Sequence, residues 1–210
     1  MKTWREVEGF FDYPYLYDQV IAGAKEDTTL VEVGSWLGQS MAYLAQGLQL
    51  KGWRGRLVAV DSFHGELNQP EHAPTVMANG GTIRPVFEQN MKDCGVFDMV
   101  EVMEGDSAAS AENFADGSVS FCFIDAAHDY DSVVRDVIAW IPKIKPGGML
   151  AGHDYPCPDV HKAVVECFAG TSYLVAGACW VKNFPLDRTP ADWRDAIKRG
   201  SEDMKRNAKQ

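Results

Sequence analysis

Short apolar runs rich in β-branched residues alternate with helical patterns along most of this chain. Such alternation predicts a mostly parallel β-sheet flanked by helices, because parallel strands need a crossover connection between them. We expect strands at residues 29–33, 56–60, 99–103, 119–124 and 148–152, then at 173–176 and 178–181. Only Gly177 separates the last two, so they should form a hairpin and add one antiparallel strand. The prediction is a Rossmann-like, doubly wound α/β fold with a seven-stranded, mostly parallel sheet and helices on both faces.

Helical patterns fill the intervals between these strands. The pattern at 130–141 is the clearest, because its apolar residues recur at the spacings of a buried helical face. Those apolar residues are Val133, Val134, Val137, Ile138 and Ile141. Thr189 followed by Pro190 is typical of a helix start and predicts a C-terminal helix over 190–206. The other expected helices are at 40–50, 83–94, 108–114 and 160–168.

The organisation of the chain follows from its length and from two irregular segments. A chain of 210 residues can close around one hydrophobic core, so we expect a single domain over 1–210. Residues 63–81 contain prolines and glycines without periodicity, which predicts a long loop over the substrate side. Residues 1–27 combine a helical segment with aromatic side chains that either form a lid or pack against the sheet. These aromatic residues are Trp4, Phe10, Phe11, Tyr13, Tyr15 and Tyr17.

Composition limits the partners. A net charge of −10 repels a phosphate backbone and disfavours a nucleic-acid partner. The apolar runs fall short of the roughly 20 residues of a membrane-spanning helix, and the N-terminus does not read as a signal peptide. We therefore expect a cytoplasmic protein with no membrane partner. The five dispersed cysteines suggest neither a disulfide framework nor a zinc site. A small molecule is the expected partner, and a homo-oligomer is left open.

The first expected strand leads into a glycine-containing turn, VEVGSWLGQS, at residues 31–40. Ligands of open α/β sheets bind beyond the carboxyl ends of the strands, so this turn is a candidate cofactor site. A dinucleotide fingerprint starting at Gly34 would need glycines in place of Trp36 and Gln39, which disfavours NAD and FAD. S-adenosylmethionine has no phosphates and makes no such demand. The alternative is that Gly34 and Gly38 only allow the turn and helix to pack closely.

Acidic residues stand at the ends of later strands. Asp61 ends the second strand, where an acid can accept both ribose hydroxyls of an adenosine. Asp106 and Ser107 follow the third strand, where an adenine edge would lie, although capping of the next helix is an equal alternative. Asp125 and Asp154 follow the fourth and fifth strands, which should be neighbours about 5 Å apart. Two carboxylates can then face one cation.

Two histidines accompany the last two acids. His153 precedes Asp154, and an imidazole ligand favours manganese, iron, cobalt or zinc, whereas magnesium prefers oxygen ligands. A metal site of Asp125, His153 and Asp154 is one interpretation, and a loop fixed by hydrogen bonds is the other. His128 follows Asp125 beyond a strand end, which favours a general base over a solvated surface histidine.

These motifs together resemble a known family. The segments FEQNMKDCGV, EGDS, FIDAAHDYDSVVRDVIAW and KPGGMLAGHDY are similar to class I S-adenosylmethionine-dependent methyltransferases, in particular the sugar O-methyltransferases of macrolide and aminocoumarin biosynthesis. With VEVGSWLGQS and VAVDSF, the resemblance covers roughly residues 30–168. It implies an enzyme that transfers a methyl group to a hydroxyl of a small molecule, a sugar or a phenol. The alternatives are a cofactor-binding protein without transferase activity and an NAD-dependent or nucleotide-sugar oxidoreductase.

The resemblance also implies roles for individual residues. In the family, the residue matching Asp125 is a magnesium ligand, the residue matching His128 is the base, and two adjacent acids follow the fifth strand. Here that pair is His153 and Asp154, so a nitrogen donor replaces one carboxylate, and the expected divalent cation is magnesium or manganese. Glu32 and the two glycines would line the methionine part of the cofactor. The full set of implied cofactor-binding residues is Glu32, Gly34, Ser35, Trp36, Gly38, Ser40, Asp61, Ser62, Phe63, Asp106, Ser107 and Asp125.

Overall fold

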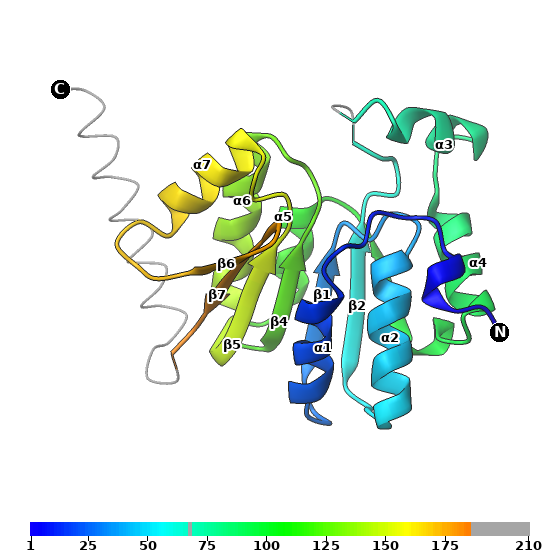
Figure 1. The fold of residues 1–210 in the computed structure, drawn as a ribbon, viewed down its shortest axis with the longest axis horizontal. Helices are drawn as coiled ribbons and strands as arrows, with labels where there is room; N and C mark the ends of the chain where they lie inside the picture. Colours follow the sequence, from blue (N-terminus) through cyan, green and yellow to red (C-terminus); the bar gives the residue numbers. More distant parts are fainter. Residues whose placement is uncertain (67–68, 186–210) are drawn as a thin grey trace. The chain divides into compact units, whose positions relative to one another are not determined.

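The structure is a computed structural model that describes residues 1–66 and 69–185. The C-terminal helix expected over 190–206 lies outside the described residues. Contacts between residues divide the chain into two compact units, Met1–Ser107 and Ala108–Gln210. Each unit combines β-strands with helices (Figure 1).

The first unit is built on three parallel strands in the order β3-β2-β1. Strand β1 is Thr29–Val33, β2 is Arg56–Asp61 and β3 is Val100–Glu104. Asp61 and Glu104 are register partners at the ends of β2 and β3, so the carboxyl ends of these strands meet at one edge. The helices are α1 (Pro14–Gly23), α2 (Gln39–Lys51), α3 (His72–Ala78) and α4 (Arg84–Asp93), with 3-10 turns at Trp4–Glu6 and Phe97–Met99.

The N-terminal aromatic residues pack within the first unit. Tyr13 and Tyr17 are buried, and both contact the ring of Phe11. Phe11 also lies against Tyr43 of α2. These aromatic side chains therefore pack against one another and against α2, whereas the side chain of Phe10 remains 69% exposed.

The segment after β2 is not one continuous loop, contrary to the prediction for residues 63–81, because helix α3 interrupts it. The helix has seven residues and a single buried side chain, Val76. One buried position is too few to produce a helical period in the sequence. Gly65 permits the close packing of this segment, since a Cβ there would lie 3.0 Å from both His72 and Val76.

The second unit contains four strands in the order β4-β5-β7-β6. Strands β4 (Val119–Ile124) and β5 (Ile144–Gly152) are parallel. Strand β7 (Cys179–Asn183) runs antiparallel to both β5 and β6 (Leu174–Ala176), which confirms the predicted hairpin. The helices are α5 (Ser107–Ser110, starting at the last residue of the first unit), α6 (Tyr130–Trp140) and α7 (Pro158–Cys167), with 3-10 turns at Ala111–Asn113 and Ile141–Lys143.

Two helical predictions in this unit need correction. The helix expected at 108–114 is split into α5 and a 3-10 turn. On α6, Ile138 is 44% exposed, although its apolar character placed it on the buried face. The buried face follows Val133, Val137 and Trp140, which are four and three residues apart, and Ile138 lies one residue, about 100°, beyond Val137.

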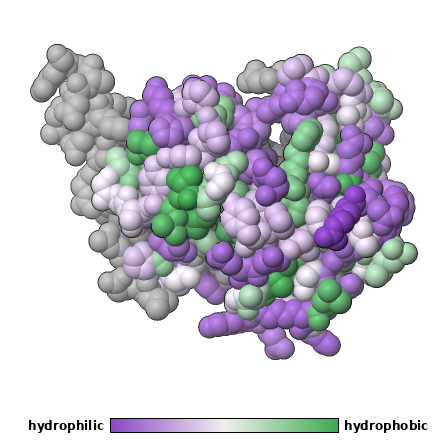
Figure 2. Space-filling view, viewed as in Figure 1, coloured by the Kyte–Doolittle hydropathy of each residue, from purple (hydrophilic) through white to green (hydrophobic). Residues whose placement is uncertain are grey.

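The seven strands confirm the predicted class, a mostly parallel α/β sheet with one antiparallel strand. Large side chains such as Trp140 and Trp180 are fully buried, while hydrophilic residues cover most of the face seen in Figure 2. All five cysteines lie in the described part of the chain and are free thiols. Among the described residues, no helix combines the length and apolar character needed to cross a membrane.

Candidate active site

One cluster of polar residues lies in the first unit, at the carboxyl ends of β1 and β2. Gly34 and Gly38 bracket the turn after β1, and both have positive φ. Trp36 between them has φ of 50° and Phe63 after β2 has φ of 58°, a conformation that is rare for bulky side chains. The carboxylate of Asp61 accepts the backbone N–H of Trp36 at 2.8 Å and that of Phe63 at 2.6 Å. Asp61 therefore ties the two turns together.

Opposing effects act on the carboxyl of Asp61 in this turn. Burial raises the pKa of the Asp61 carboxyl, and hydrogen bonds from the backbone N–H groups of Phe63, Trp36 and Ser35 oppose that rise. The Ser35 hydroxyl is buried and has no hydrogen-bond partner among the described residues. A buried hydroxyl of this kind is costly unless something satisfies it, so the turn suits a ligand with polar groups.

Helix α3 contributes a residue that the sequence did not single out. The imidazole of His72 stacks on the indole of Trp36, with ring centroids 4.1 Å apart and planes 25° apart. His72 also accepts the backbone N–H of Glu66 at Nδ1, at 3.1 Å. The sequence shows only a histidine between two prolines, because the short α3 has no visible period.

Three predicted cofactor residues have buried side chains. Glu32 is fully buried on β1 and accepts a 2.5 Å hydrogen bond from the Tyr17 hydroxyl. Phe63 is fully buried and its ring lies 5.3 Å from that of Phe87. Ser40 is buried within α2. Any contact of Phe63 with a ligand at this edge is therefore expected from its backbone.

Gly38 has a packing role that needs no cofactor. A Cβ at this position would lie 2.6 Å from Cε of Met91 and 2.9 Å from the ring of Phe87. The turn therefore packs directly on α4, as the structural alternative expects for Gly38. At the end of β3, Asp106 is exposed and immediately precedes Ser107, the first residue of α5, which is the position of a helix cap.

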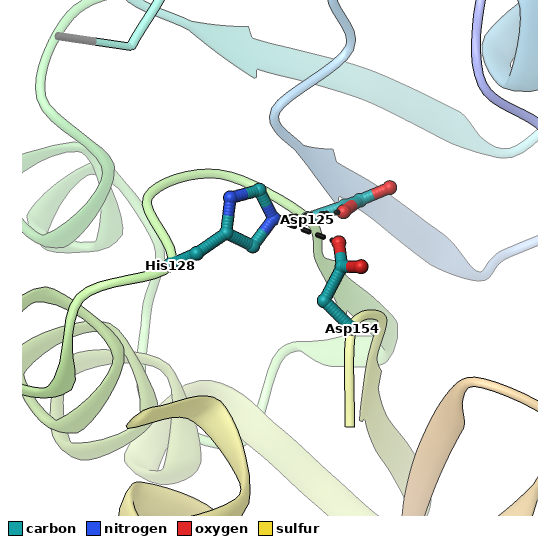
Figure 3. Close-up of side chains that lie close together, drawn as sticks. All are labelled: Asp125, His128 and Asp154. Atoms are coloured by element: carbon teal, nitrogen blue, oxygen red, sulfur yellow. Dashed lines mark ion pairs between the residues drawn. The ribbon is translucent and has the colours of Figure 1, made fainter. Parts of the chain in front are cut away.

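A second cluster of polar residues lies in the second unit, at the carboxyl ends of β4 and β5 (Figure 3). Ile124 and Gly152 are register partners, so Asp125 leaves the sheet beside the pair His153 and Asp154. His128 comes from the loop between β4 and α6, and its imidazole points toward both carboxylates.

Both imidazoles approach the same two carboxylate oxygens. Nε2 of His128 lies 2.8 Å from Oδ2 of Asp154 and 3.7 Å from Oδ1 of Asp125. Nδ1 of His153 lies 3.1 Å and 3.7 Å from those same two oxygens. His128, followed by His153, holds the pKa of Asp154 well below its usual range. Asp154 is thus an anion at neutral pH.

The backbone fixes this geometry. Asp154 has φ of 53°, a left-handed conformation that aspartate tolerates better than most residues. Its carbonyl accepts the N–H of Cys157 at 2.8 Å, and the N–H of His153 donates to the carbonyl of Ile124 at 3.1 Å. Asp129 caps α6 by accepting the N–H of Ser132 at 3.0 Å, which anchors the loop that carries His128.

Three of these residues form a group that could hold a metal ion. The donor atoms of Asp125, His128 and Asp154 all lie within 4.8 Å of one another, and His153 reaches the same oxygens. Donors that share an ion at about 2.0–2.2 Å stand roughly 2.8–3.6 Å apart. The structure therefore brings together all four residues for which the sequence suggested a metal or base role.

Ligands of α/β proteins bind beyond the carboxyl ends of parallel strands, and both clusters of polar residues lie at such ends. A family model described as a methyltransferase domain matches residues 31–155, more than half of the chain. The chain belongs to this methyltransferase domain family, as the resemblance seen in the sequence predicted. A comparison with curated protein sequences finds no match.

Solved structures share the fold. The O-methyltransferase NovP has 17% identity and a TM-score of 0.64, over 82% of this chain and 77% of NovP. Cofactor-bound Rv0187 from MTB has 19% identity and a TM-score of 0.60, over 87% and 85% of the two chains. CalS11, a TDP-rhamnose 3'-O-methyltransferase of calicheamicin biosynthesis, has 16% identity and a TM-score of 0.50, over 80% and 75%. At these identities the similarity establishes the fold.

Proposed function

We propose that this chain transfers a methyl group from S-adenosylmethionine to a hydroxyl of a small molecule, a sugar or a phenol, with help from a divalent cation. The observation that carries the proposal is the cluster of two carboxylates and two imidazoles at the ends of β4 and β5. Membership of the methyltransferase family supplies the reaction class. The names of NovP and CalS11 support oxygen as the methylated atom.

The cofactor is proposed to bind at the carboxyl ends of the strands of the first unit. The carboxylate oxygens of Asp61 accept the backbone N–H groups of Trp36 and Phe63, and a carboxylate has further lone pairs with which to accept a ribose hydroxyl. The Ser35 hydroxyl offers a further polar group to the ligand. Asp106 is exposed at the end of β3, where the adenine is proposed to lie. Rv0187, a solved structure with the same fold, binds a cofactor, which supports a cofactor site in this chain.

His128 is the proposed general base. An alcohol that keeps its hydroxyl proton is a poor nucleophile, and an imidazole is suited to remove that proton near neutral pH. Nε2 of His128 lies 2.8 Å from Oδ2 of Asp154, so the carboxylate is placed to orient the ring. The imidazole takes the hydroxyl proton while the oxygen bonds to the methyl carbon and the carbon–sulfur bond breaks, releasing S-adenosylhomocysteine. The anionic Asp154 stabilises the imidazolium that forms.

Asp125, His153 and Asp154 are the proposed ligands of the cation, magnesium or manganese. A bound dication would make the acceptor hydroxyl more acidic and so lower the demand on the base. Two carboxylates and neutral imidazole ligands balance the charge of one divalent ion.

The test combines a thermal-shift panel with isotopic methyl transfer. S-adenosylhomocysteine should raise the melting temperature by mass action, and NAD should not. Labelled S-adenosylmethionine should then transfer its methyl group to a member of a library of sugars and phenols. A rise with NAD alone would contradict the proposal in favour of an oxidoreductase. Stabilisation by S-adenosylhomocysteine without transfer to any acceptor would indicate a binding protein.

A further inference from the structure

We propose that His153 makes the cation site of the second unit select a transition-metal ion such as Mn²⁺ over Mg²⁺. The proposal rests on the proposed function only in placing a cation within the cluster. It assigns His153 as the nitrogen ligand and leaves His128 for proton transfer. His153 is then the residue that determines which metal the protein uses.

The donor set is the first argument. The oxygens available at the ends of β4 and β5 are those of Asp125 and Asp154, and Nδ1 of His153 lies 3.7 Å and 3.1 Å from them. Nε2 of His128 lies 3.7 Å and 2.8 Å from the same two oxygens, so an ion placed between them meets an imidazole nitrogen as its third protein donor, from His153 or from His128. Imidazole nitrogen suits manganese, iron, cobalt and zinc, whereas magnesium favours an all-oxygen shell with retained water.

The placement of His153 is the second argument, because it distinguishes this histidine from His128. His153 directly follows Gly152, the last residue of β5, and its N–H is bonded to the carbonyl of Ile124. Its side chain is 12% exposed, compared with 19% for His128. His128 belongs to the loop before α6. A ligand held by the sheet is preorganised, whereas a base must also reach the acceptor.

Metal binding without substrate tests the proposal. Titration calorimetry with Mn²⁺ alone and with Mg²⁺ alone should show at least about tenfold tighter binding of Mn²⁺ by the unmodified protein. Pulsed electron paramagnetic resonance of the Mn²⁺ complex should show coupling to a nitrogen nucleus. Equal affinity for the two ions, or a nitrogen-free Mn²⁺ spectrum, would overturn the proposal without any variant.

Variants then identify the nitrogen. His153→Asp replaces it with oxygen, so the Mn²⁺ preference should fall by about tenfold or more and the nitrogen coupling should disappear. His161→Gln, at an exposed histidine of α7 in the same unit, is the matched control and should change neither. Loss of the coupling in His128→Ala, with retention in His153→Asp, would overturn the assignment. Circular dichroism checks that each variant is folded.

The outcomes separate this proposal from that of methyl transfer. Preferential binding of Mg²⁺ by a protein that transfers methyl groups would refute the role of His153 and leave the function intact. Selective, nitrogen-coupled binding of Mn²⁺ by a protein that does not bind S-adenosylhomocysteine would refute the function and leave the metal site intact.

Discussion

Replacement of Asp61 by alanine tests whether this carboxylate holds the first unit's ligand edge together. The carboxylate accepts N–H groups from Trp36 at 2.8 Å and Phe63 at 2.6 Å. Both donors belong to residues with positive φ. The substitution leaves two backbone N–H groups without their acceptor, in two residues with left-handed backbone.

The expected magnitude follows from these two bonds. A hydrogen bond to a charged group contributes about 1.5–3 kcal/mol, so the pair sets an upper range of about 3–6 kcal/mol. Burial raises the pKa of Asp61, which shows that the charged carboxylate also costs free energy to bury. We therefore expect Asp61→Ala to lower the free energy of unfolding by about 2–4 kcal/mol. A domain stable by 5–15 kcal/mol stays folded after such a loss.

Two measurements check this expectation. Urea unfolding gives the loss of stability, and calorimetric titration should show S-adenosylhomocysteine binding weakened by about 1.5–3 kcal/mol. The stability of Asp61→Asn should lie between the stabilities of wild type and Asp61→Ala. Its amide oxygen can accept one backbone N–H, whereas its NH₂ group would face the second backbone N–H and cannot accept it. If Asp61→Ala unfolds within about 0.5 kcal/mol of wild type, the turns do not depend on this carboxylate. Unchanged ligand affinity would remove Asp61 from the cofactor site.

Four further predictions concern both units. His128→Ala should lower turnover roughly 10²- to 10⁴-fold with S-adenosylhomocysteine affinity unchanged by calorimetry, and wild-type turnover would exclude it as the base. Exhaustive chelation should reduce transfer while circular dichroism stays constant; full activity of metal-free protein would make the acids structural. Gly38→Ala should lower the free energy of unfolding by about 1–3 kcal/mol, since its Cβ would lie 2.6 Å from Met91, and unchanged urea unfolding would contradict this. The pKa of Asp154 is depressed in the folded state. Its ionised carboxylate therefore stabilises the fold above the unfolded-state pKa of about 3.9, and this stabilisation is lost as the pH falls below that value toward the folded-state pKa. In urea titrations, Asp154→Asn should have a lower free energy of unfolding than wild type at pH 6, and the difference should narrow toward pH 2. A difference independent of pH would refute this dependence on the ionised carboxylate.

The strands were predictable wherever burial produced continuous apolar runs. Residues 29–33 and 119–124 were predicted with the bounds of β1 and β4, since strands buried on both faces show no alternation. The start of β5 was missed because KPGG at 145–148 is typical of a turn. In the structure these residues belong to β5, and the register of its pairing with β4 shifts between Val119 and Phe121.

The membership of the candidate site was more predictable than its geometry. Acids that follow parallel strands must gather at one edge, so Asp125 and Asp154 could be paired from the sequence alone. Nothing in the sequence shows that His128 and His153 approach the same oxygen of Asp154. That arrangement depends on the left-handed backbone of Asp154 and on the loop path, neither of which leaves a periodic signal.

Strained backbone lies beside the clusters of polar residues in both units. Trp36, Phe63 and Asp154 are the non-glycine residues with positive φ in the described chain, and they follow β1, β2 and β5. Each such conformation costs about 1–3 kcal/mol and persists only where its surroundings fix it. In each case a carboxylate makes the fixing contact: Asp61 accepts the N–H groups of the first two, and the Asp154 carboxylate itself meets two imidazoles. The polar groups are therefore ordered before a ligand arrives, and binding does not have to supply that ordering.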